Sequence, residues 1–423
     1  MCAASASTER NIDTIVQTRA VRDSSTQART VGVLVAGQVL AGLGQGATLA
    51  IGAIIANEIA GAAFSGAAAT ASTLGAAIAA IPLARLAQRF GRRPALALGA
   101  TIAAVGSITT VIATGLVLFP LLLVGFAFLG VGTAVGLQAR VAATDAAAPE
   151  RRGRDLSLVV WSTTIGAVVG PNLFGPGELI QDAWGLPQHT GSFVIAIAAQ
   201  IVAALLYFIA LRPDPLFLGR STTVDGVTVK DPGIIKSQRA LTFAIATIAV
   251  SHAVMVSVMS MTPVHLVSHG ATLSFVGITI SLHVAGMFAL SPVFGWASDR
   301  WGRLPVIFSG HGMLAASVII IGVAPLDMVA VTVALALLGT GWSAATVAGS
   351  ALVSDLVTGD KRLVVQGRTD SIMSLSGAIG GASAGVVLAL VGYSGLAWTA
   401  GVLVLGMVAA ALVMSSRQAI PRY

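Results

Sequence analysis

Four residues in the second half of the chain have side chains and a spacing that suit a soft metal ion. Met255 and Met259 are four residues apart, as are His283 and Met287, and residues at this spacing share one face of a helix. Thioether sulfur and imidazole nitrogen are good ligands for Cu(I), whereas Mg, Ca and Mn prefer oxygen. Neutral ligands add no charge to a low-dielectric site, and weak repeated binding lets an ion leave as well as enter. The four residues therefore predict a copper path, against the alternative that the methionines are flexible core filler.

Four further histidines are candidates for metal or proton binding. His252 precedes Met255 by three residues on the same side of a helix, so it is a fifth ligand, a proton carrier or a packed, hydrogen-bonded histidine. His265 and His269, four residues apart at a helix end, either collect copper or are simply solvated, and we favour the second. His311 lies about 10 Å from the start of its own span at 304, counted at about 1.5 Å per residue. This start is on the other side of the membrane from His265 and His269, so His311 is a candidate exit ligand.

The composition requires most of the chain to be solvated by lipid. Of the 423 residues, 56% are hydrophobic and 10% are charged, against about 25% charged in a typical soluble protein. Apolar runs of about 20 residues, long enough to cross a hydrocarbon core of about 30 Å, repeat along the chain. We therefore expect an all-α membrane protein that crosses the lipid bilayer twelve times. The expected spans are 31–57, 64–84, 94–114, 117–139, 156–176, 190–211, 240–264, 272–294, 304–323, 327–350, 370–391 and 394–415.

The distribution of charge predicts the orientation of these helices. If the polar N-terminal tail, residues 1–30, is cytoplasmic, all 24 Lys and Arg residues fall on the cytoplasmic side, and such a bias sets orientation. The tail lacks the apolar core of a signal peptide. We expect a bacterial plasma (inner) membrane protein with both tails, 1–30 and 416–423, in the cytoplasm. The net charge of +7 then faces the inner leaflet, and no soluble domain remains that could bind nucleic acid.

The chain repeats internally. A connection at 213–239 joins two units of six spans each, 31–212 and 240–415. Six-span repeats predict two helical bundles that face each other across a central cavity, with one bundle rocking against the other to give alternating access. The equivalent residues are Gly91 and Gly302, Arg92 and Arg303, Gly130 and Gly339, Gly132 and Gly341, and Asp145 and Asp355, at offsets of 209–211 residues.

These features resemble the major facilitator superfamily over residues 31–415. In that family the loop after the second span of each half latches the inner gate, and the two copies here read ARLAQRFGRR and GWASDRWGR. The first copy has glutamine where the family has an acid. The fifth span is similar to the glycine-proline motif of the family's antiporters, and we interpret it as a kinked, tightly packed helix. The resemblance implies gating roles for Gln88, Gly91, Arg92, Asp299, Arg300, Gly302 and Arg303, and a mechanical role for Gly166, Gly170, Pro171 and Gly175.

The Met and His pattern is also similar to that of one subgroup, the CcoA-type copper importers that supply cytochrome oxidase assembly. The resemblance implies that Met255, Met259, His283 and Met287 ligate the metal. Counted at about 1.5 Å per residue from expected outer ends near 264 and 272, Met259 lies about 8 Å deep, Met255 about 14 Å, His283 about 17 Å and Met287 about 22 Å. Met255 and His283 would then meet. Copper is expected as the transported substrate, with no cofactor, in a monomeric protein.

Other functions remain open at this stage. A proton-coupled efflux antiporter for a drug or small hydrophobic metabolite is the main alternative, favoured by the glycine-proline motif. Phe126 and Leu129 stand where such antiporters carry arginine and glutamine, and no carboxylate is expected at mid-depth, which opposes it. A non-transporting membrane sensor lacks an output domain in the short tails. The chain has no Ser/His/Asp grouping or phosphate-binding loop, so we do not expect an enzyme, and its single Cys2 excludes an intramolecular disulfide.

Overall fold

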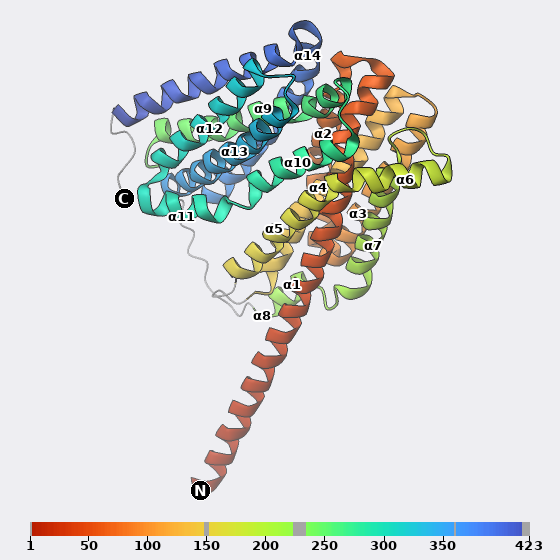
Figure 1. Ribbon diagram of the computed structural model, residues 1–423. Helices are drawn as coiled ribbons and strands as arrows, with labels where there is room; N and C mark the ends of the chain where they lie inside the picture. Colours follow the sequence, from red (N-terminus) through yellow and green to blue (C-terminus); the bar gives the residue numbers. More distant parts are fainter. Residues whose placement is uncertain (1, 148–151, 223–233, 359–360, 417–423) are drawn as a thin grey trace.

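The computed structural model describes residues 2–147, 152–222, 234–358 and 361–416, and these residues are helical almost throughout (Figure 1). The one β-type contact in them is an isolated bridge between Ile235 and Val357. The helices, with η for short 3₁₀ turns, are α1 (Cys2–Ala60), η1 (Ala62–Phe64), α2 (Ala67–Phe90), α3 (Arg92–Gly115), α4 (Phe119–Asp145), α5 (Arg152–Val169), η2 (Gly170–Leu173), α6 (Phe174–Trp184), α7 (Gly191–Ala210), α8 (Pro215–Thr222), α9 (Gln238–Ser268), α10 (Leu273–Phe288), α11 (Ser291–Trp301), α12 (Arg303–Val323), α13 (Met328–Leu356) and α14 (Lys361–Ser416).

The expected all-α membrane class is confirmed. Eleven helical stretches of the described residues are long and apolar enough to cross a membrane. The last stretch, Val365–Met414, is broken at Gly392, whose φ of 71° and ψ of −177° suit glycine alone, so it accounts for two of the twelve expected crossings.

Three differences from the expected spans bear on the candidate site. The span expected at 156–176 is interrupted, because Pro171 has no N–H and the chain passes through η2 before α6 begins. The span expected at 272–294 is divided between α10 and α11, with a short break at Ala289–Leu290. The span expected to end at 264 continues as α9 to Ser268.

The N-terminal tail is not separate from the first span. Helix α1 begins at Cys2 and extends away from the other helices at its start (Figure 1). The Gln27 side chain is buried and donates to the Asp155 carboxylate at 2.7 Å and to the Ala143 carbonyl at 3.0 Å. Packing of α1 therefore begins before residue 31. The expected C-terminal tail beyond Ser416 and the linker residues 223–233 lie outside the described residues.

The molecule consists of two bundles, α1–α7 and α9–α14. Within each bundle, the backbones of neighbouring helices approach closely at small residues. A side chain at Gly42 of α1 would meet the backbone at Gly166 of α5, and one at Gly310 of α12 would meet the backbone at Gly341 of α13. Small residues permit this close approach, and the approach stabilises the bundle because packing, rather than the hydrophobic effect, holds helices together in lipid.

The hydrophobic cores show where the bundles touch. One cluster crosses between them and includes Phe126 of α4 and Met261 of α9. A second cluster, around Leu96, lies within the first bundle, and a third, around Leu352, lies within the second. We call the side with the α2–α3 and α11–α12 turns the motif face, and the side with the α1–α2 and α9–α10 turns the opposite face. The shared cluster belongs to the half toward the opposite face.

Candidate gates and binding site

On the opposite face, the start of α2 contacts α9 and α14 of the other bundle. The Ser65 hydroxyl donates to the Met261 sulfur at 3.0 Å, and the Thr70 hydroxyl donates to the Ala378 carbonyl at 3.2 Å. A side chain at Gly66 would overlap the Gly381 carbonyl, so glycine is needed for this approach. Met261, a methionine that the sequence analysis left without a role, is therefore part of a contact between bundles.

A second contact on the opposite face joins the end of α5 to α10. The Ser281 hydroxyl donates to the Val168 carbonyl at 2.6 Å and accepts from the Asn172 amide at 2.7 Å. A side chain at Gly277 would overlap the Pro171 carbonyl. These contacts and the shared hydrophobic cluster close the opposite face.

The glycine-proline motif lies along this closure. Gly166 packs against the α1 backbone, where a Cβ would overlap the Val39 carbonyl. Gly170 and Pro171 form the η2 turn, and a side chain at Gly175 would come within 2.9 Å of the Ser274 hydroxyl of the other bundle. The kink that the motif predicts is present, and it places Pro171 against α10.

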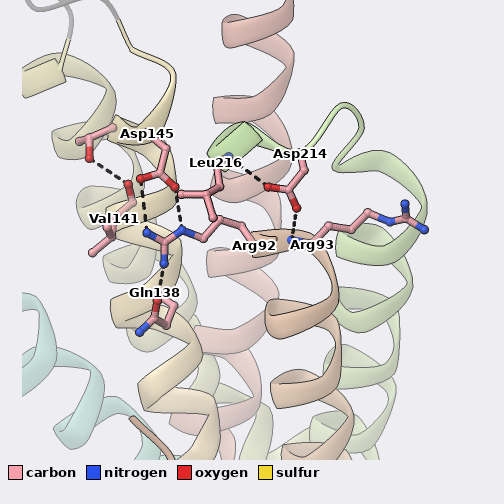
Figure 2. Close-up of polar contacts among 8 residues, drawn as sticks. Arg92, Arg93, Gln138, Val141, Asp145, Asp214 and Leu216 are labelled. Carbon is pink, nitrogen blue, oxygen red and sulfur yellow. Dashed lines mark hydrogen bonds and ion pairs between the residues drawn. The ribbon is translucent and has the colours of Figure 1, made fainter. Parts of the chain in front are cut away.

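At the motif face of the first bundle, Arg92 links α3 to α4 (Figure 2). Its guanidinium pairs with the Asp145 carboxylate at 2.7 Å and donates to the Gln138 side-chain oxygen at 2.6 Å. The Asp214 carboxylate accepts from the Arg93 backbone N–H at 2.9 Å. Gln88 is exposed, and Gln138 supplies a neutral partner within the same network. Neither Gln138 nor Asp214 belongs to the expected loop motif, so the sequence analysis missed both.

The second bundle repeats this arrangement with one more carboxylate. Arg303 pairs with Asp355 at 2.9 Å and with Asp299 at 2.5 Å, while Arg300 is exposed. The preceding turns are alike as well, since Gly302 has a φ of 92° and Gly91 a φ of 98°, values that favour glycine. Each network joins helices of its own bundle.

At mid-depth, each bundle ties its first and fourth crossings together by one side-chain hydrogen bond. Gln45 of α1 donates to the Thr133 hydroxyl of α4 at 2.9 Å. The Trp342 indole N–H of α13 donates to Nδ1 of His252 on α9 at 3.1 Å. Thr133 and Trp342 are 209 residues apart, the offset that relates Gly132 to Gly341. Gln45 and His252 are 207 residues apart, so the two contacts join corresponding helices of the two bundles without being residue-for-residue equivalents.

An aromatic group surrounds the contact in the second bundle. Trp342, 9% exposed, packs edge-on against Phe288 with ring centroids 6.1 Å apart and lies 5.8 Å from the His252 ring. His252 accepts at Nδ1, so its proton is assigned to Nε2, which lies close to Gly377 of α14. Of the readings open for His252, the packed and hydrogen-bonded one describes its contacts here.

Of the expected metal ligands, Met255 belongs to the hydrophobic cluster that the two bundles share, and Met259 and Met287 pack against it, but the depths differ from expectation. Because α9 continues to Ser268 and α10 begins at Leu273, residue counts place Met259 level with His283 and Met255 level with Met287. By this count Met255 lies about 4.5 Å deeper than His283, at about 1.5 Å per residue, and their meeting stays a prediction. Helix α9 packs mainly along α14 and α13, while α10 packs mainly along α13.

His283 is the most enclosed of the four. It is fully buried, donates from Nδ1 to the Leu335 carbonyl at 2.7 Å, and its Nε2 has no hydrogen-bond partner among the described residues. Met255 is 2% exposed, and Met259 and Met287 are partly buried. No group of three or more His, Cys, Asp or Glu that could hold a metal ion occurs in the described part of the chain.

The remaining histidines have structural partners. His265 is buried rather than solvated, because it stacks on Tyr393 with centroids 4.2 Å apart and donates from Nε2 to the Pro325 carbonyl at 2.6 Å. His269 is exposed, as we favoured. His311 is buried and donates from Nδ1 to the Ile307 carbonyl of its own helix at 2.9 Å.

An ion pair that the sequence analysis missed lies on the opposite face. His189, in the turn before α7, is 3.0 Å from the Glu58 carboxylate at the end of α1. This hydrogen bond raises the pKa of His189 above its ordinary value, against the smaller lowering effect of burial.

Comparison with known families establishes what kind of protein this chain is. The family model of the Major Facilitator Superfamily matches residues 34–274 and again 243–422, and the chain belongs to this family of transporters, which are not enzymes. The MFS-type transporter YddS of Bacillus subtilis (strain 168), itself described as uncharacterized, is 36% identical over 388 residues, covering 89% of this chain and 88% of that protein.

Two further likenesses concern substrate and fold. The riboflavin transporter RfnT of Brucella anthropi is 29% identical over 326 residues, covering 77% of this chain and 80% of that protein. A bacterial homologue of the human lysosomal transporter Spinster, solved in an inward-facing and occupied conformation, has a TM-score of 0.69 at 17% identity and covers 93% of this chain and 97% of that one. The comparisons support a transporter of unspecified substrate and lend no support to copper specificity.

Proposed function

We propose that the chain carries a small, uncharged organic solute across the membrane by alternating access, binding it at mid-depth between the two bundles. The observation that carries this proposal is a pair of hydrogen bonds between corresponding helices of the two bundles, Gln45 to Thr133 and Trp342 to His252. Both pairs lie at the level where the bundles cease to share a hydrophobic core, and each comes from the first and fourth crossings of its bundle.

The side chains at this level suit a neutral ring. The carboxamide of Gln45 and the exposed hydroxyl of Thr133 offer neutral donors and acceptors. Trp342 and Phe288 offer aromatic faces and edges, which bind planar rings by stacking or edge-to-face contact. A charged solute would have to lose its hydration without an opposite charge among these four residues, which is strongly unfavourable in a low-dielectric site. The likeness to a riboflavin transporter supports the same class of solute.

The closed opposite face and the bias of Lys and Arg support an orientation. If the motif face is cytoplasmic, as this bias indicates, the closed opposite face is the outer one, which is the arrangement expected of an inward-facing state. We therefore place the protein in the plasma membrane with both termini in the cytoplasm. Hydrophobic patterning is alike in importers and exporters, so the efflux alternative is tested by the direction of flux.

The test is solute counterflow in liposomes that contain the purified protein, with riboflavin as the first probe. We expect Trp342→Ala to lose most of the flux, because the largest aromatic surface at mid-depth is removed. The matched control is Trp184→Ala at the end of α6, since Trp184 is 68% exposed and should leave flux unchanged. Equal flux in the two variants would refute the mid-depth site.

A second candidate is import of copper, favoured by the state of His283. Its Nδ1–H donates to a backbone carbonyl, which is how ligating histidines are oriented, and its Nε2 has no hydrogen-bond partner among the described residues. In copper-uptake-deficient cells, the Met255→Ala/His283→Ala variant should then accumulate no more copper than an empty vector. Met313→Ala, a half-buried methionine of α12, is the control. Equal accumulation by wild type and vector would exclude copper import.

A further inference from the structure

Gln200 of α7 carries a polar group that the fold buries without satisfying. The residue is fully buried, and neither its amide nitrogen nor its amide oxygen has a hydrogen-bond partner among the described residues. A buried amide without partners is strongly unfavourable, and native structures retain one where water or a ligand completes its bonds.

The Gln200 amide lies in a notch of α1. A Cβ at Gly44 would come within 2.9 Å of its nitrogen, so the absence of a side chain there makes room for the amide head. Seven residues earlier in α1, Gly37 receives the ring of Tyr207, which is seven residues later in α7. The two helices are thus in a regular register, with two polar α7 side chains seated against two glycines.

The notch brings the Gln200 amide next to that of Gln45. A Cβ at Gly132 of α4 would lie 3.0 Å from the Gln45 nitrogen and 3.6 Å from the Gln200 nitrogen, so the two amides flank one glycine. Gln45 is half-buried and bonded to the exposed Thr133, whereas Gln200 is sealed. Gln45 therefore lies between Thr133, which is exposed at mid-depth, and the buried Gln200.

We infer that Gln45 and Gln200 together form a carboxamide pair that binds a neutral ring edge with both a hydrogen-bond donor and acceptors, the edge of a cyclic imide or lactam. Each carboxamide offers one acceptor oxygen and two donor hydrogens, so two of them complement a C=O, N–H, C=O sequence. Binding requires Gln45 to turn from Thr133, which opens the way to Gln200. This inference rests on the proposed transport of a neutral organic solute and names its class.

The experiment compares two probes on the purified full-length protein by calorimetry. Riboflavin has a cyclic imide edge, and its N3-methyl derivative lacks the imide donor; uracil and lumichrome extend the panel. We expect wild type to bind riboflavin about tenfold more tightly than the methyl derivative, the worth of one or two neutral hydrogen bonds. Gln200→Leu should bind both alike, while its melting temperature stays the same or rises, because two unsatisfied groups are removed.

The control and the second variant keep the test decisive. Tyr207→Phe removes a buried hydroxyl that has no hydrogen-bond partner among the described residues, seven residues along the same face of α7, and should retain the tenfold preference. If Gln200→Leu does not fold, Gln45→Leu at the half-buried partner should show the same loss of preference. A preference that survives in either leucine variant, or no binding of any panel member by wild type, would overturn the inference. Binding that depends on Trp342 and not on Gln200 would overturn it while leaving the proposed function intact.

Discussion

Removing the Ser281 hydroxyl should open the opposite face. Ser281 is 6% exposed and makes two hydrogen bonds between bundles, to the Val168 carbonyl and from the Asn172 amide. A neutral hydrogen bond contributes about 0.5–1.5 kcal/mol, so Ser281→Ala destabilises the closed state by about 1–3 kcal/mol. When the face opens, water can bond to Val168 and Asn172, so the open state loses less. The equilibrium should therefore shift toward the open state by about 5- to 150-fold.

The assay measures distances between spin labels in a Cys2→Ser background, since Cys2 is the single cysteine. Labels at Leu179 and Leu326, which are 73% and 69% exposed, report across the opposite face. Labels at Phe90 and Trp301, which are 55% and 63% exposed, report across the motif face. The first distance should gain a longer population in Ser281→Ala, and the second should gain a shorter one.

Ser309→Ala is the matched control, because the Ser309 hydroxyl donates at 2.8 Å to the Val306 carbonyl of its own helix. It should leave both distances unchanged. If Ser281→Ala, folded and in the membrane, leaves both distributions as in wild type, these bonds do not hold the face closed. The assignment of the closed gate to the α5–α10 contact would then be refuted.

Three further outcomes follow from other contacts. Arg140 and Asp370 lie on opposite bundles and interact electrostatically, so Arg140→Asp should disfavour closure of the motif face, and the exchange Arg140→Asp/Asp370→Arg should restore it in the same distance assay. Because Glu58 raises the pKa of His189, their pairing stabilises the fold fully below about pH 6.5 and is lost as pH rises through the raised pKa; Glu58→Gln should lower the melting temperature at pH 6 and leave it unchanged at pH 9. The effect is small, about 0.2–1 kcal/mol, since Glu58 is 44% exposed. Gly392→Ala forces a side chain into a backbone region open to glycine alone and should cost about 1–3 kcal/mol, seen as a lower melting temperature.

The parts of the protein that sequence reasoning predicts are those set by local chemistry and repetition. Lipid-length apolar runs predict the helices, and the repeat predicts that Gly91 and Gly302 correspond, which agrees with their similar φ values of 98° and 92°. The repeat relates Asp145 to Asp355, and both accept an ion pair from the arginine at the matching position. These features need no knowledge of which helices pack together.

The parts that sequence reasoning missed depend on the register between helices distant in sequence. Gln200 reads as one polar residue in an apolar helix until α7 is placed against the glycines of α1. Met261 reads as core filler until η1 brings Ser65 to it. His265 at a helix end suggests solvent exposure, and its burial depends on Tyr393 beyond the break in α14.

The relative depths expected for the proposed metal ligands depend on where α9 ends. A shift of four residues in the end of α9, from 264 to Ser268, changes which residue of α9 is level with His283. One helical turn rises about 5.4 Å, so an error of one turn in a helix boundary reassigns the partner.

The most direct test of the account is riboflavin binding by the purified wild-type protein beside Trp342→Ala, with copper offered to the same preparations. The account predicts saturable riboflavin binding that Trp342→Ala loses. Copper binding that depends on His283, with no riboflavin binding by either protein, would contradict it and establish the metal path in its place.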